Sequence, residues 1–215
     1  MRRINFNLIR EFEFTATFMC LPEELEAGLV GFPETSERIE SSLMFCSKLT
    51  YCDPKEDPLA ATKAGRYFRA ALAEYVSIEE ALNRERPLGT PEFNLYSTEN
   101  PLPHILEQLR HLQVHLTISE MSDRSVSLWL KNVPGSEPVD VRIWTISNLT
   151  DSQLTSLRAF KNGKHYTAAQ ATEMVKWINT RQADFGIHDL VHRGLVEVAE
   201  RIAAIYLPRT QATSQ

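Results

Sequence analysis

Cysteine is scarce in this chain, and no long apolar run occurs in it. Only three of the 215 residues are cysteines, and their odd number and irregular spacing fit reduced thiols better than a metal-binding motif: Cys20, Cys46 and Cys52. No stretch reaches the roughly 18 apolar residues that a membrane-spanning helix requires. Polar residues interrupt the segment that follows the basic N-terminus, so no apolar signal core is present. We therefore expect a cytoplasmic protein that does not enter a membrane.

The chain also lacks a surplus of basic residues. Lys and Arg number 23 against 28 Asp and Glu, which gives a formal net charge of −5. Because proteins that wrap nucleic acid non-specifically carry a basic surplus, this charge argues against a scaffold-like DNA-binding protein. An enzyme with a small local basic site stays possible. The hydrophobic content of 43% suffices for a substantial core, which favours a single domain over residues 1–207 with a polar tail at 208–215.

Apolar residues recur at helical spacing along most of the chain. The longest such pattern predicts a helix over 59–84, with one face formed by six apolar residues and Glu79: Phe68, Ala71, Leu72, Tyr75, Ile78, Glu79 and Leu82. Prolines, acidic first turns and capping residues place the ends of the other helices. These are expected at 4–18, from Pro22 to about Leu49 with a disturbance at Pro33, from Pro101 or Pro103 to near His115, from Asp151 to Phe160, from Thr167 through Ile178, and at 185–206.

One part of the chain has the alternation of a β-hairpin. Residues 125–130 and 139–146 alternate with a period of two, and Pro134-Gly135-Ser136 lies between them. Because an isolated hairpin is only marginally stable, it must pack against the helices. The predicted fold is therefore mainly α, an up-and-down bundle of five to seven helices with a β-hairpin insertion at about 125–146. Trp129 and Trp144 in this hairpin are expected to pack in the hairpin and core rather than stack on bases.

The segment from Arg110 to His115 carries side chains suited to chemistry on a phosphate. Arginine is a permanent cation whose planar fork matches phosphate oxygens, and histidine exchanges a proton near neutral pH. Metal-independent RNA cleavage needs both functions, one to move the proton of the ribose 2′-hydroxyl and one to stabilise charge on the phosphate. On a helix, His111 and His115 share a face, whereas Arg110 lies about 100° from His111. Either the helix ends before His115, or a second subunit completes the site.

The pattern Arg110-His111-x-x-x-His115 resembles the signature of the HEPN (higher eukaryotes and prokaryotes nucleotide-binding) superfamily. Residues 8–14 also resemble the opening helix of bacterial HEPN-like proteins, and residues 65–72 resemble a middle helix, so the similarity covers about residues 4–116. The resemblance implies a helical bundle that is often a homodimer, and for many members a metal-independent endoribonuclease of a toxin or defence system. It places Arg110 on the phosphate, makes His115 the general acid or base and lets His111 assist. RNA and a cognate antitoxin protein are then the implied partners, and no cofactor is required.

Two other interpretations stay open at this stage. In a non-catalytic helical interaction protein, Arg110 and His115 would be buried or capped by carboxylates, whereas an active protein needs them in an exposed cleft. In a metal-binding bundle, the pair His111 and His115 would face the pair His188 and His192, because each spacing can place two imidazoles on one ion. No obvious anionic partners accompany these histidines, and we expect no metal site.

Overall fold

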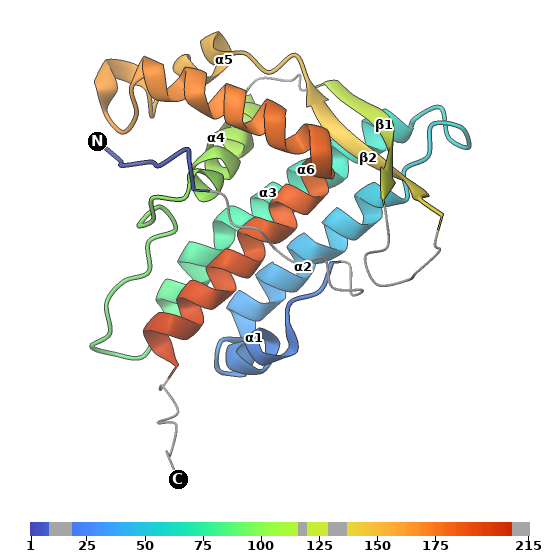
Figure 1. Ribbon diagram of the computed structural model, residues 1–215. Helices are drawn as coiled ribbons and strands as arrows, with labels where there is room; N and C mark the ends of the chain where they lie inside the picture. Colours follow the sequence, from blue (N-terminus) through green and yellow to red (C-terminus); the bar gives the residue numbers. More distant parts are fainter. Residues whose placement is uncertain (9–18, 116–119, 129–136, 208–215) are drawn as a thin grey trace.

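Two long antiparallel helices run through the middle of the molecule. The structure, a computed structural model, describes residues 1–8, 19–115, 120–128 and 137–207 and is mainly helical, with one small hairpin (Figure 1). Helix α2 (Pro33–Thr50) packs along α3 (Ala60–Glu85). The carboxylate of Glu85, at the end of α3, accepts hydrogen bonds from the backbone N–H groups of Glu34 and Thr35 at the start of α2. It therefore satisfies backbone donors that the helix itself cannot pair.

The sequence predicted this helical pair closely. The predicted helix over 59–84 is α3, and its six apolar face residues are all buried. The predicted disturbance at Pro33 separates α1 (Glu23–Gly28) and the 3₁₀ turn η1 (Leu29–Gly31) from α2. Proline occupies the first turn of α2, where its missing N–H costs no hydrogen bond.

Helix α6 (Ala168–Tyr206) is bent in its middle. Gly186 has φ 75° and ψ 163°, a backbone conformation that essentially only glycine adopts. The sequence predicted two helices here, from Thr167 through Ile178 and over 185–206, but the first half continues past Ile178 to the bend at Gly186. The first half crosses one end of the molecule, and the second half runs beside α3 (Figure 1). Thr167 caps the first half, as predicted, by accepting a hydrogen bond from Gln170 N.

The hairpin packs on the helices through one face. Strands β1 (Glu120–Leu128) and β2 (Val139–Ser147) pair antiparallel and contact α3 and α6. The Trp144 side chain is 1% exposed and donates from Nε1 to the carbonyl of Cys52, which confirms its predicted packing role. The predicted start of the first strand at 125 is wrong, because β1 already begins at Glu120. Its first residues are mostly polar and exposed, so they lack the apolar alternation that marks a half-buried strand.

The remaining elements are α4 (Pro101–His115), α5 (Asp151–Thr155) and η2 (Lys161–Gly163). The predicted helix from Asp151 to Phe160 is too long, because its last residues form separate turns that bury Phe160. The predicted helix over 4–18 is wrong for residues 4–8, which are not helical. Residues 9–18, the predicted turn at 134–136 and the tail at 208–215 lie outside the described residues. Within the described ranges, no helix combines the length and apolar character needed to cross a membrane.

Candidate functional site

Helix α4 carries Arg110 and His111, and most of its other described side chains are buried. Its apolar side chains pack into the core at Leu102, Ile105, Leu109 and Leu112. Arg110 and His111 are half-buried. The backbone of His115 forms the last residue of the helix, but its side chain lies outside the description. The predicted meeting of His115 with Arg110 therefore stays a prediction.

A buried carboxylate one helical turn away faces His111. His111 Nε2 lies 3.8 Å from Glu107 Oε1, and the two side chains are 37% and 14% exposed. The other carboxylate oxygen, Oε2, accepts hydrogen bonds of 2.7 Å from both Arg2 Nη1 and Gln108 Nε2. Glu107 is thus held on one oxygen while its other oxygen is directed toward the imidazole.

The environment of Glu107 keeps this carboxylate ionised. Burial raises the pKa of Glu107, but the nearby imidazole of His111 and the guanidinium of Arg2 lower it, and the net shift is downward. A negative charge beside a half-exposed imidazole favours one ring orientation. This is how a carboxylate orients a histidine that takes up and releases protons.

Behind this pair lies a fully buried hydrogen-bond chain. His104 is 0% exposed, and its Nε2 lies 2.9 Å from the carbonyl oxygen of Thr98, which can only accept. His104 Nδ1 therefore accepts from the hydroxyl of Tyr166, 2.9 Å away. Burial lowers the pKa of His104 and favours the neutral ring that this chain requires. The stripe that His104 and Gln108 form is accordingly a buried network and not part of an open surface.

Arg110 has no acidic partner in the described part of the chain. Its Nε is buried and has no hydrogen-bond acceptor there. The side-chain nitrogen of Gln113, three residues further along α4, is also buried without an acceptor. By contrast, Arg2, Arg38 and Arg84 all form ion pairs with glutamates.

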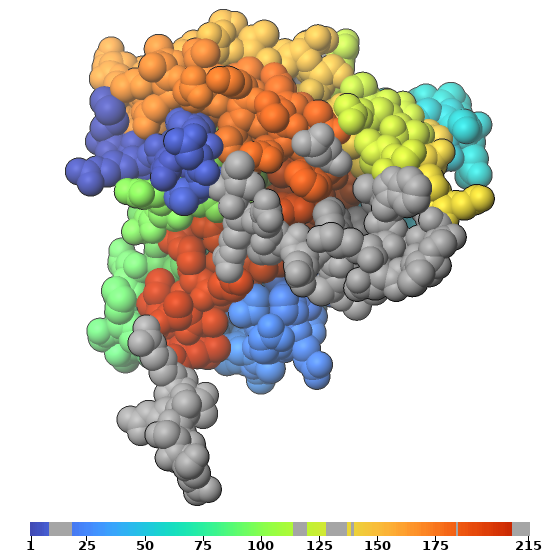
Figure 2. Space-filling model, viewed as in Figure 1, coloured from blue at the N-terminus to red at the C-terminus, as the bar shows by residue number. Residues whose placement is uncertain are grey.

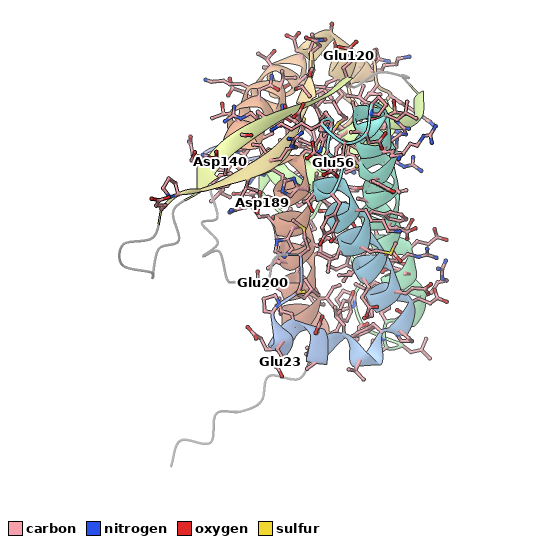
Figure 3. All side chains as sticks on the ribbon, turned by 90° about the vertical axis from the view of Figure 1, so that its right-hand side faces the viewer. Glu23, Glu56, Glu120, Asp140, Asp189 and Glu200 are labelled. Carbon is pink, nitrogen blue, oxygen red and sulfur yellow. The ribbon has the colours of Figure 1, made fainter. Side chains whose placement is uncertain are left out.

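The second histidine pair lies in a different environment, on the second half of α6. His188 is 2% exposed, its Nδ1 has no partner in the described part, and burial together with His192 lowers its pKa to about 4. His192 Nε2 lies 2.9 Å from the carbonyl oxygen of Cys20. Asp189, which Figure 3 shows on α6 near the hairpin, pairs at 2.5 Å with Arg193.

The two histidine pairs form no metal site among the described residues. Among the residues described, no three His, Cys, Asp or Glu side chains gather in a group that could hold one. The side chain of His115 lies outside the described residues.

Comparisons with protein-family models, with curated proteins and with solved structures find no match for this chain. The chemistry of the site must therefore be judged from its own residues. The spacing of Glu107 and His111, four residues apart, is a sequence signal for their contact on a helix. Nothing in the sequence points to Arg2, which is 105 residues away from Glu107 along the chain.

Proposed function

We propose that this chain is a HEPN-like RNA-binding protein and a metal-independent endoribonuclease. One observation carries the proposal: a half-exposed histidine, held by a buried carboxylate, sits next to an arginine that has no carboxylate partner among the described residues. The first group suits proton transfer near neutral pH, and the second suits binding and stabilisation of a phosphate. In this proposal Arg110 binds the phosphate, and His111, oriented by Glu107, works together with His115.

The reaction that these groups support is an internal transfer at phosphorus. One histidine takes the proton of the ribose 2′-hydroxyl, the 2′-oxygen forms a bond to phosphorus, and the bond from phosphorus to the 5′-oxygen breaks. The other histidine gives a proton to the departing 5′-oxygen. The products are a 2′,3′-cyclic phosphate and a 5′-hydroxyl end. Arg110 stabilises the charge that develops on the phosphate oxygens during this step.

The proposal includes a cytoplasmic homodimer and a cognate antitoxin protein, in accordance with the resemblance of Arg110-His111-x-x-x-His115. Two-fold symmetric dimers are the commonest oligomers and place identical patches against each other. Because Arg110 and His115 diverge on one helix, the arginine of one subunit would complete the site of its partner.

An RNA cleavage assay in excess chelator tests this proposal. We expect wild-type protein to cleave single-stranded RNA, and both His111→Gln and His115→Gln to cleave it about 10²–10⁴ times more slowly. Arg110→Gln should lose a comparable factor through lost charge stabilisation. Arg158→Gln removes an exposed arginine outside the site and serves as the matched control, with an unchanged rate. Circular dichroism checks that each variant is folded.

A non-catalytic helical interaction protein is the second candidate function. It is favoured by the burial of His104, Gln108 and the Arg110 Nε, which makes much of the polar side of α4 structural. Wild-type protein that neither cleaves nor binds any RNA would support this candidate. Cleavage that survives substitution of both Arg110 and His111 would also contradict the ribonuclease proposal, since it would come from another site or from a contaminant.

A further inference from the structure

The side chain of Arg2 is enclosed between two aromatic rings. Its guanidinium carbon lies 4.0 Å from the centre of the Tyr96 ring and 5.3 Å from that of Tyr166. Such contacts stabilise a guanidinium while leaving its N–H groups free to donate in the plane. Arg2 Nη1 uses that freedom to donate to Tyr166 Oη at 2.6 Å and to Glu107 Oε2 at 2.7 Å.

The backbone around Arg2 is fixed as well. Arg2 N donates to the carbonyl of His165, and its own carbonyl accepts from Gln170 Nε2. Asn5 N donates to the carbonyl of Glu99. Figure 2 shows these N-terminal residues lying against the first half of α6 and the segment that precedes α4. The position of the guanidinium is thus set by contacts on both sides of it.

We infer that Arg2 is a positioning residue for His111 and acts on it through Glu107. This inference rests on the proposed function, because it assigns Arg2 a part in the same reaction. Arg2 and Gln108 both bind Oε2 of Glu107, which leaves Oε1 for the imidazole 3.8 Å away. Without Arg2, the Glu107 carboxylate would keep only its ion pair with His111 among the described residues. Its orientation would then no longer be fixed.

The ionisation of Glu107 is where this role can be measured. Burial raises the pKa of Glu107, and the nearby imidazole of His111 and the charge of Arg2 oppose that effect. Removing the Arg2 charge should therefore raise the pKa of this carboxyl. Titratable and charged groups surround Glu107 from several elements: the N-terminal segment, α3, α4 and the segments that precede α4 and α6. These groups are Arg2, Tyr75, Tyr96, His104, His111, His165 and Tyr166. Of these, only Arg2 is a permanent cation.

Carbon-13 NMR of the Glu107 carboxyl, followed as a function of pH, tests the inference in the full chain. We expect Arg2→Gln to move the Glu107 titration upward by about one pH unit, since a neighbouring opposite charge typically lowers a carboxyl pKa by one unit or more. Arg2→Lys keeps the charge and should restore most of the wild-type midpoint. Arg3→Gln removes the neighbouring exposed arginine and should leave the titration as in wild type.

Cleavage kinetics supply the second readout. The acidic limb of the pH–rate profile should move upward in Arg2→Gln, and the double variant Arg2→Gln with Glu107→Gln should cleave no more slowly than Glu107→Gln alone. A full additional loss in the double variant would show that Arg2 does not act through Glu107. A Glu107 titration that is the same in Arg2→Gln and wild type would overturn the inference. Absence of cleavage by wild type would instead overturn the proposed function, and with it the role of Arg2 in cleavage, whereas the NMR titration would still decide the link to Glu107.

Discussion

Two histidines that each begin a pair with the same spacing, His111 and His188, occupy different environments in this molecule. On α4, His111 is half-exposed and faces a carboxylate that is held in place from behind. On α6, His188 is buried beside the bend, its Nδ1 has no partner in the described chain, and His192 lies against a backbone carbonyl. Spacing on a helix therefore determines which side chains share a face, but the surrounding elements determine whether a histidine can meet a substrate.

The carboxylates near the two histidines, Glu107 on α4 and Asp189 on α6, also differ in their surroundings. Glu107 accepts hydrogen bonds from Arg2 and Gln108 on one oxygen and directs the other toward His111. Asp189 is 3% exposed, and burial raises its pKa even though Arg193 opposes that effect. A buried ion pair within one helix of this kind contributes to structure, since its charges cannot reach solvent. The comparison favours α4 as the site of chemistry and α6 as part of the core.

The largest expected effect on stability is at the bend of α6. A Cβ at position 186 would lie 2.8 Å from His188 Cε1 and 2.9 Å from Ile143 Cβ, and the backbone φ of 75° is strained for any residue but glycine. We expect Gly186→Ala to lower the free energy of unfolding by about 3 kcal/mol or more, from backbone strain and overpacking together. Urea denaturation followed by circular dichroism measures this loss.

The matched control for this variant is Gly31→Ala. No atom lies within 4 Å of a Cβ at this position, and its backbone is not in the left-handed region. Its stability should stay within about 0.5 kcal/mol of wild type. Equal stabilities of the two variants would show that the bend does not require glycine.

The next effect on the free energy of unfolding, up to the same size, is expected from the protonation of His188. In the unfolded chain this histidine gains a proton below its ordinary pKa of 6.5, whereas in the folded chain it stays neutral until the pH reaches about 4. The folded state is therefore penalised progressively as the pH falls from 6.5 to about 4, by up to about 3 kcal/mol. Urea denaturation between pH 7.5 and 4.5 should show a steeper loss for wild type than for His188→Gln. The same pH dependence in both proteins would contradict the burial of a neutral His188.

The smallest effect is expected on the α4 side; it has the same sign of linkage as that of His188 but lies at lower pH. The pKa of Glu107 is lower in the folded chain than its ordinary value of 4.5. Its contribution to stability is therefore present above pH 4.5 and is lost as the pH falls through the folded pKa. Glu107→Gln should flatten the acid-induced loss of stability below pH 4.5, relative to wild type, in the same denaturation experiment. An unchanged acid limb would mean that Glu107 is not held by Arg2 and His111 in solution.

The sequence predicted the parts of the fold that depend on local pattern. The periodicity of α3, the cap at Thr167 and the break between the halves of α6 all depend on residues close together in the chain. The non-helical segment at residues 4–8 was predicted as a helix from its local apolar spacing, but Asn5 N donates to the carbonyl of Glu99, a long-range contact that no local pattern reveals.

The candidate site divides in the same way. Arg110 and His111 were named from their chemistry, and the contact of His111 with Glu107 follows from helical spacing. The hold of Arg2 on Glu107 depends on how the N-terminal segment crosses the folded molecule. The burial of His104 and Gln108 depends on packing against other elements, and only the structure separates these residues from the half-exposed His111.

The nature of the RNA ends tests most directly the claim that α4, and not α6, carries the chemistry. Single-stranded RNA is incubated in chelator with wild type, His111→Gln or His192→Gln, and phosphorus-31 NMR identifies the products. We expect a 2′,3′-cyclic phosphate from wild type and from His192→Gln, and almost none from His111→Gln over the same time. An equal amount of cyclic phosphate from His111→Gln and wild type, or products that carry no cyclic phosphate at any time, would contradict the account.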